Sequence, residues 1–263
     1  GTIDEFIGDA IMALFGAPVS REDDAERAVA CAVAMQLAMA QVNEQNRRDG
    51  LPEVHMGVAV NTGDVIVGNI GSHKRTKYGV VGMHVNLTSR IESFTLGGQV
   101  LVSEETARAA GPSLVLGQRL TLRAKGFNEP VIVHEVKGVQ GRWRLTLPEP
   151  ARELSPLLQP LGVRLHVVHG PHAAGDPLEG QIVRAGAAVV EVKAGPVPPP
   201  HSEVRLRVLG ADGREAPWDL YGRVTANGAA RGCFLVSLTA PRPEVVQLLQ
   251  DAIVGRAGRL RSL

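Results

Sequence analysis

This sequence has few aromatic residues and almost no excess of charge of either sign. Only 3% of its 263 residues are aromatic, which disfavours a surface that stacks nucleic-acid bases. The 28 basic and 27 acidic side chains leave a formal net charge of +1, which disfavours broad electrostatic attraction to nucleic acid or membranes. We therefore expect no nucleic-acid partner.

Cysteines and long apolar runs are also few. Cys31 and Cys233 lie far apart without metal-ligand spacing, which is typical of a reduced, cytoplasmic protein. No stretch resembles a signal peptide or a membrane span. The chain begins with Gly1 inside an apolar strand pattern, so we expect missing upstream residues and membrane attachment only through them.

The first pattern present is residues 3–18, IDEFIGDAIMALFGAP. Short apolar runs on either side of Ile7, Gly8 and Asp9 predict a hairpin of two buried strands. A carboxylate at the mouth of a rigid hairpin suits a hard cation such as Mg²⁺. Aspartate is also a common turn former, and this stretch alone favours that interpretation of Asp9.

The rest of the first half alternates helices and strands. We expect a helix from Asp23 or Asp24 to Arg48, and a hairpin of residues 54–60 and 64–70 around Asn61-Thr62-Gly63. Further segments are a strand (78–81), a helix (85–94), a strand (100–102), a helix capped by Ser103 (104–110) and an antiparallel pair (114–124 and 131–136). This order predicts an α+β sandwich with helices over a mainly antiparallel sheet.

The second half has a different pattern. Prolines without periodicity predict a linker at residues 141–161, between regions 1–140 and 162–258. Six short strands between residues 163 and 238, separated by turn signals, predict a small closed β-barrel. A helix follows, with Pro243 in its first turn and Gly255 at its end.

Asn86 and Arg90 lie four residues apart, so a helix places them on one face. An arginine with an amide one turn before it suits a phosphate and the sugar beside it, because the guanidinium fork binds oxyanions bidentately. A surface arginine paired with a nearby acid is the ordinary alternative for an isolated N-x3-R.

Five segments in order, FIGDAIMALFGAP, VAVNTGDVIVGNIGS, VNLTSRIES, VLVSEET and KG, resemble the catalytic domain of class III nucleotide cyclases. The resemblance covers residues 2–138 and implies a partial ferredoxin-like sandwich. It implies an enzyme of signal transduction that converts ATP or GTP to the cyclic nucleotide and pyrophosphate. It omits the family's N-terminal part, which carries the first metal-binding aspartate.

The resemblance also implies roles for single residues. Asp9 matches the second metal-binding carboxylate of a site for two Mg²⁺ or Mn²⁺ ions. Asn86 matches the residue that positions the ribose, and Arg90 the residue that stabilises charge at phosphorus in the transition state. Lys125 matches the lysine that holds the terminal phosphates. The family's sites lie between subunits, which implies a homodimer.

The residue at the position that contacts the base distinguishes between GTP and ATP as the substrate. Glu5 stands where bacterial adenylate cyclases usually have lysine, and an ionised glutamate only accepts hydrogen bonds. Guanine presents two donors there, so Glu5 favours GTP. Gly79 is the second base-reading position and contributes no side-chain contact. An adenylate cyclase with a relaxed pocket, and a Glu5 that is simply a solvated charge, remain the alternatives.

Gly82-Met83-His84 departs from the family, which commonly has an acid or amide after this glycine. The helix N-terminus loses a favourable charge. A catalytically silent homologue that serves as a dimerisation or regulatory module is therefore a further alternative.

Residues 187–253, with LYGRV and SLTAPRPEVVQLLQDAI, are similar to a PilZ-type barrel. Neither the R-x3-R segment nor the rim motif that binds cyclic di-GMP is present, so we expect an interaction or regulatory barrel. His166, His169 and His172 form H-x2-H-x2-H, but Gly170 and Pro171 interrupt it. We expect a strand end and loop there rather than a metal site.

Overall fold

The computed structural model describes residues 1–72, 74–122, 126–127, 129–149, 154–169, 172–186, 188–200, 202–210, 214–217, 219–228, 230–239, 241 and 243–255. The chain divides into two compact units, Gly1–Pro148 and Glu149–Leu263. The division falls inside the range where the linker was expected. No helix within the described ranges is both long enough and apolar enough to cross a membrane.

The first unit is built on a sheet in which the strands follow the order β3-β6-β8-β7 and β9 also pairs with β8. β3 and β6 are parallel, and the other pairs are antiparallel. The bounds are β3 (Val58–Val60), β6 (Val100–Ser103), β7 (Leu114–Leu122), β8 (Val131–Val139) and β9 (Leu145–Thr146).

Helices cover both faces of this sheet. Val100 and Val102 of β6 pack with Val33 of α1 (Asp24–Arg48), and α3 (Glu104–Ala110) lies on the same face. Leu101 points to the other face, where it packs with Ile91 of α2 (Met83–Glu92). Because successive side chains of β6 point to opposite faces of the sheet, this strand contributes to two hydrophobic cores. The expected α+β sandwich is confirmed. A 3₁₀ turn, Gly111–Ser113, follows α3.

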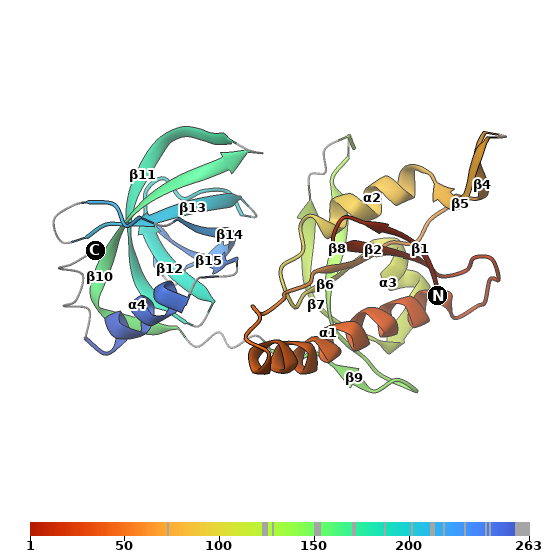
Figure 1. The fold of residues 1–263 in the computed structure, drawn as a ribbon, viewed down its shortest axis with the longest axis horizontal. Coiled ribbons are helices and arrows are strands. Elements are labelled where there is room, and N and C mark those ends of the chain that lie inside the picture. Colours follow the sequence, from red (N-terminus) through yellow and green to blue (C-terminus); the bar gives the residue numbers. More distant parts are fainter. Residues whose placement is uncertain are drawn as a thin grey trace. The chain divides into compact units, whose positions relative to one another are not determined.

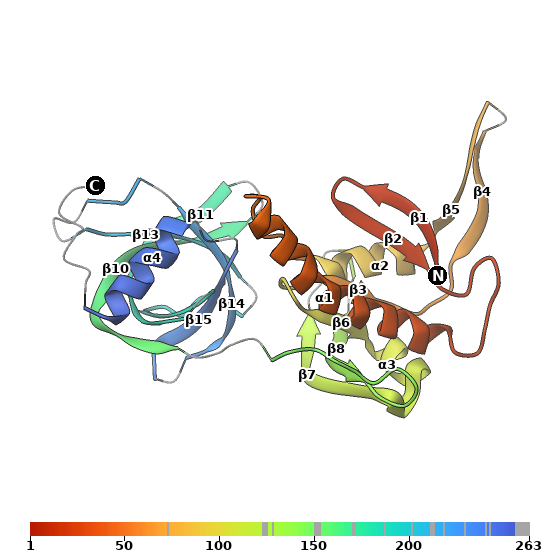
Figure 2. The same cartoon turned by 60° about the horizontal axis from the view of Figure 1, so that its bottom comes forward.

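Two hairpins complete the unit (Figures 1 and 2). β1 (Thr2–Ile7) pairs with β2 (Ala10–Leu14), as the sequence predicts. The strands are not buried as expected: Phe6 is 68% exposed, and other apolar side chains of the pair are also exposed. The reason is that β1 and β2 form a two-stranded sheet of their own. β4 (Ile66–Ser72) and β5 (Arg75–Val81) form the second hairpin, which projects as an arm.

The expected hairpin of residues 54–60 and 64–70 is wrong. β3 pairs with β6, whereas β4 pairs with β5. The polar residues between β3 and β4 bind helices instead of closing a turn between strands. Thr62 Oγ1 lies 3.0 Å from Thr106 Oγ1 of α3, and Asn61 Nδ2 donates to the carbonyl oxygen of His84 in α2 at 3.1 Å.

The second unit is a closed barrel with the strand order β10-β11-β12-β15-β14-β13, as the sequence predicts. Its interior is filled by alternate residues such as Val163, Leu165 and Phe234, and α4 (Pro243–Ile253) packs Leu249 against this core. The strands are β10 (Ser155–His169), β11 (His172–Ala185), β12 (Val189–Ala194), β13 (Glu203–Val208), β14 (Leu220–Asn227) and β15 (Cys233–Leu238). β10 begins inside the range expected for the linker. The PilZ resemblance stays a prediction.

Candidate active site

Asp9 lies in the tight turn between β1 and β2, where its side chain is exposed. Ile7 and Ala10 are the last paired residues on each side, so two residues make the turn. Gly8 has φ of +64°, a left-handed conformation that glycine adopts without strain. The hairpin therefore holds the Asp9 carboxylate at its tip.

The donor chemistry at Asp9 fits Mg²⁺ or Mn²⁺. Mg²⁺ is usually held by one or two carboxylates, with substrate phosphates and water completing its shell. No group of three or more His, Cys, Asp or Glu side chains able to hold a metal occurs among the described residues. Asp9 would therefore contribute one ligand, and a bound nucleotide would contribute others.

Asn86 and Arg90 are brought together on α2. Both side chains are exposed, while Leu87 and Ile91, the residues that follow them, pack in the core. The helix thus presents a neutral amide and a permanent cation on one solvent-facing stripe. Such a stripe is able to bind the sugar and phosphate of a nucleotide.

The N-terminus of α2 is anchored in an unusual way. Gly82 precedes it with φ of 155° and offers no side-chain cap, and no acid lies in the first turn. The Asn61 amide instead donates to the His84 carbonyl, and the His84 ring packs on Gly63 so closely that a Cβ there would lie 2.3 Å away. The β3–β4 loop therefore fixes the start of the helix that carries Asn86 and Arg90.

Glu5 has a partner that sequence reasoning missed. Its Oε1 lies 2.6 Å from Lys77 Nζ on β5, and both side chains are about half exposed. Lys77 precedes Gly79 by two residues, so strand alternation places both on one face of β5. That spacing is the signal that could have identified Lys77 as a neighbour of Gly79.

Gly79 faces a second carboxylate. A Cβ built on Gly79 would lie 3.7 Å from Asp4 Oδ1, a buried oxygen without a hydrogen-bond partner among the described residues. Ile3 pairs with Ala13 and Glu5 with Met12, so Asp4 is the extra residue of a β-bulge. A bulge interrupts strict alternation, which allows Asp4 and Glu5 to face β5 together.

The structure does not join all the candidate residues. Neither a hydrogen bond nor an ion pair links Asp9 to Asn86 or Arg90 within the described part of the chain. Lys125 lies outside the described residues. The roles of these residues stay predictions.

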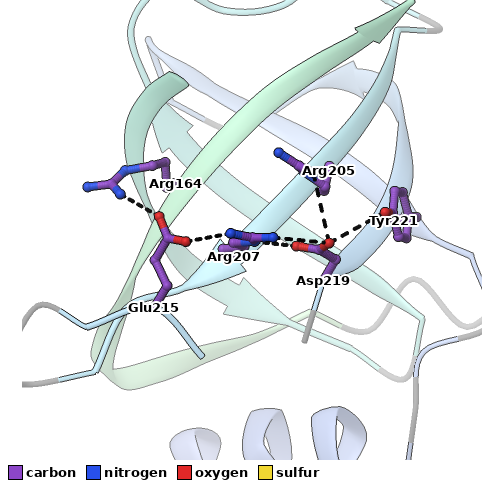
Figure 3. A network of polar contacts seen from close by, with 6 residues as sticks. All are labelled: Arg164, Arg205, Arg207, Glu215, Asp219 and Tyr221. Atoms are coloured by element: carbon purple, nitrogen blue, oxygen red, sulfur yellow. Dashed lines mark hydrogen bonds and ion pairs between the residues drawn. The ribbon is translucent and has the colours of Figure 1, made fainter. Parts of the chain in front are cut away.

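The barrel carries a separate polar network on its outer surface (Figure 3). Arg207 of β13 donates to Asp219 and, at 2.7 Å, to Glu215 Oε2. Glu215 also accepts from Arg164 of β10, and Asp219 is within ion-pair distance of Arg205. The network ties two adjacent strands to the segment before β14, which favours a role in barrel stability.

The network shifts several protonation equilibria. Hydrogen bonds from Arg207 hold the pKa of Asp219 and the pKa of Glu215 below their usual values. The same two carboxylates, with Asp219 the stronger influence, raise the pKa of Arg207. Burial, together with the nearby Arg205 charge, lowers the pKa of His166. His166 is therefore held toward its neutral form by its surroundings.

Comparison with known proteins identifies the family to which the first unit is related. Residues 4–136, about half of the chain, match the family of adenylate and guanylate cyclase catalytic domains. The crystal structure of the guanylyl cyclase Cya2 is 55% identical with a TM-score of 0.55, over 56% of this chain and 75% of that chain. The chain therefore belongs to the adenylate and guanylate cyclase family, and its first unit contains the nucleotide cyclase domain.

Two curated relatives agree with this family assignment. Adenylate cyclase 1 of Rhizobium meliloti is 33% identical over 141 residues, which are 53% of this chain and 21% of that protein. The adenylate cyclase of Anabaena cylindrica is 34% identical over 146 residues, 52% of this chain and 28% of that protein. The chain thus spans about a quarter of the length of these two relatives. Class III cyclases generally use divalent metal ions, and their catalytic domains commonly dimerise.

Proposed function

We propose that the protein converts a purine nucleoside triphosphate, GTP in preference to ATP, to the 3′,5′-cyclic nucleotide and pyrophosphate. The observation that supports this most is the stripe of Asn86 and Arg90 on α2, in a chain of the cyclase family. We also propose a cytoplasmic location, where purine triphosphates are available.

The reaction is an internal displacement. The ribose 3′-oxygen forms a bond to the α-phosphorus, the bond from that phosphorus to the bridging oxygen breaks to release pyrophosphate, and the 3′-hydroxyl proton passes to solvent water. Arg90 stabilises the charge that develops on the phosphoryl oxygens, and Asn86 orients the ribose. Two Mg²⁺ or Mn²⁺ ions, when bound, activate the 3′-hydroxyl and neutralise the phosphates. Asp9 is the ligand that this chain contributes.

The preference for GTP rests on Glu5. Its carboxylate accepts hydrogen bonds from N1–H and the N2 amino group of guanine. Adenine presents the N1 acceptor at that place, so an ionised glutamate leaves two acceptors face to face. Lys125 is proposed to hold the terminal phosphates, and Gly79 leaves space beside the base.

A homodimer is proposed because cyclase catalytic domains commonly dimerise, with sites between their subunits. Exposed apolar side chains on β1, β2, β4 and β5 support an interface there. In a symmetric dimer, the carboxylate of one subunit meets the Asn/Arg pair of its partner.

The role of Arg90 is tested by Arg90→Ala in the full-length protein with Mn²⁺ and GTP. We expect kcat to fall about 10² to 10³-fold, because one transition-state donor is removed. Arg108→Ala, at an exposed arginine of α3, is the matched control and should retain activity. Equal activity of Arg90→Ala and Arg108→Ala would refute the role of Arg90.

The role of Glu5 is tested by Glu5→Lys. We expect the ratio of kcat/KM for GTP to that for ATP to fall about tenfold or more, because the carboxylate acceptor is lost. An unchanged ratio would leave the cyclase but remove Glu5 from base recognition.

A further inference from the structure

A row of three side chains crosses the outer surface of the barrel beside the polar network. His166 of β10 pairs with Arg205 of β13, and Arg205 pairs with Tyr221 of β14. Residues opposite each other in antiparallel strands project from the same face, with Cβ atoms about 4.5–5.5 Å apart. Val204 and Leu206, the neighbours of Arg205 in β13, are buried in the core, so the row faces outward. An imidazole, a guanidinium and a phenol therefore lie side by side on the surface.

Arg205 differs from the other two arginines of the network in its hydrogen bonds. Arg207 donates to Asp219 and Glu215, and Arg164 donates to Glu215. The Nε atom of Arg205 is buried and has no hydrogen-bond partner in the part of the chain that the structure describes. Its Nη1 atom lies 4.0 Å from Asp219 Oδ2, an ion-pair distance that is too long for a hydrogen bond. The Arg205 side chain is 24% exposed, so this permanent cation is accessible to a ligand.

The charge around His166 is positive. Burial is the largest cause that lowers the pKa of His166, and the charges of Arg205 and Arg207 lower it further. Arg164 acts in the same direction, while Glu215 opposes these arginines. A bound anion therefore meets a favourable potential at this row.

Tyr221 supplies an aromatic ring at the other end of the row. The residue is 51% exposed, and its hydroxyl lies 3.5 Å from Asp219 Oδ2, at the end of the network opposite to Arg164 (Figure 3). An exposed aromatic ring offers a face on which a nucleobase of any kind stacks. A ring beside an arginine thus suits a ligand that carries both a planar ring and an oxyanion.

We propose that His166, Arg205 and Tyr221 form a binding site for a small nucleotide on the outer surface of the barrel. Arg205 binds the phosphate through its planar fork of donors, His166 donates a further hydrogen bond to it, and the Tyr221 ring packs against the base. The ligand is a nucleoside monophosphate or a cyclic nucleotide, which share a phosphate joined to a ribose and a base. The site lies in the second unit and is independent of the proposed cyclase reaction.

A purely stabilising role of Arg205 is tested in the full chain without ligand. Arg207→Gln should lower the urea midpoint of the barrel, because two carboxylates lose a hydrogen-bond donor. Arg205→Gln should leave the midpoint close to that of the wild type, because no hydrogen bond of ordinary length is lost. If Arg205→Gln lowers the midpoint as much as Arg207→Gln, Arg205 serves the stability of the barrel and the proposal is overturned.

Binding is measured by NMR at His166 in the full chain, because the cyclase domain is also expected to bind nucleotides and total binding does not distinguish the two sites. The ring resonances are assigned with His166→Gln. Titration with GMP should shift them, and the pKa of His166 should rise on saturation, because the phosphate charge favours the protonated ring. No change at His166 with GMP or cyclic GMP at about 10 mM would overturn the site.

Variants of Arg205 test which side chain holds the phosphate. Arg205→Gln should raise the dissociation constant read at His166 about 10- to 100-fold, as for loss of a charged hydrogen bond. Arg205→Lys keeps the charge without the planar fork and should bind more weakly than the wild type but more tightly than Arg205→Gln. Lys193→Gln removes one positive charge from an exposed position of β12 and should bind as the wild type does. Equal weakening by Arg205→Gln and Lys193→Gln would overturn the role of Arg205.

A comparison of probes tests the class of ligand. GMP and cyclic GMP should each bind at least about tenfold more tightly than inorganic phosphate, because only the nucleotides reach Tyr221. Tyr221→Ala should abolish that difference. Tighter binding of cyclic GMP than of GMP would identify a cyclic nucleotide as the ligand, and the reverse order would identify a mononucleotide; both results support the site. Inorganic phosphate that binds as tightly as both nucleotides would overturn the nucleotide as the ligand.

Discussion

At the residue scale, Asp4 Oδ1 is a buried acceptor without a partner among the described residues. Gly79→Ser should place a hydroxyl within reach of this oxygen, because a Cβ at Gly79 lies 3.7 Å from it. We expect a gain in unfolding free energy of about 1 kcal/mol, measured by urea denaturation.

Gly68→Ser is the matched control, because Gly68 pairs with Gly79 across the arm and a Cβ there meets nothing within 4 Å. Both variants gain from replacing glycine in a strand, so their difference isolates the hydrogen bond. Equal stability of the two would show that the serine hydroxyl does not satisfy Asp4.

Sequence patterns located the residues whose geometry is local. The turn at Asp9 and the shared helical face of Asn86 and Arg90 follow from spacing alone. Lys77 and Asp4 were missed because their positions depend on the non-local packing of β1 against β5 and on a bulge that interrupts alternation.

At the scale of helices and strands, local features were again predictable from the sequence and non-local contacts were not. Alternation and turn signals were sufficient for the barrel, in which every strand pairs on both sides. They failed for residues 54–70, where a strong turn signal suggested a hairpin. There, side-chain bonds from Asn61 and Thr62 to two helices outweigh the local preference.

The anchoring of α2 gives a prediction about activity. Gly63→Ala brings a methyl group into the His84 ring, so the ring and the helix start must shift. We expect kcat to fall about tenfold, because Arg90 is displaced from its productive position. His84→Ala in the same chain should restore most activity, and no restoration would place the effect outside this contact.

The barrel network gives a prediction about acid stability. The pKa values of Asp219 and Glu215 are lowered on folding from ordinary values of 3.8 and 4.5. Their stabilising contribution is therefore complete above about pH 4.5 and is lost as the pH falls through the lower folded values. Asp219→Asn should reduce the loss of barrel stability between pH 5 and pH 3.

The measurement is the urea concentration at which half of the barrel is unfolded. It is followed by hydrogen exchange of β13 in the full chain at pH 5 and at pH 3. Glu179→Gln is the control, because Glu179 is the exposed partner of Arg164 at 3.5 Å. An acid dependence in Asp219→Asn equal to that of the wild type would contradict the network's contribution.

At the scale of the whole molecule, catalysis is expected to require two chains. Ile66 lies at the start of the β4–β5 arm and is 71% exposed, so Ile66→Glu should not disturb the fold of one chain. We expect this variant to shift the protein toward monomer by about tenfold or more in dissociation constant, and to lose activity at low concentration.

Analytical ultracentrifugation and activity are measured over the same concentration range. Restored activity at high protein concentration supports a dimeric site. A monomeric variant with full activity would show that one chain is sufficient.

The most direct test of the central proposal is the product formed by the full-length protein from equimolar GTP and ATP with Mn²⁺. Mass spectrometry distinguishes the cyclic nucleotides in one reaction. We expect cyclic GMP in excess over cyclic AMP, because an ionised Glu5 accepts hydrogen bonds from the two donors that guanine presents. Cyclic AMP in excess would contradict the base recognition, and the absence of both products would contradict the assignment of cyclase activity.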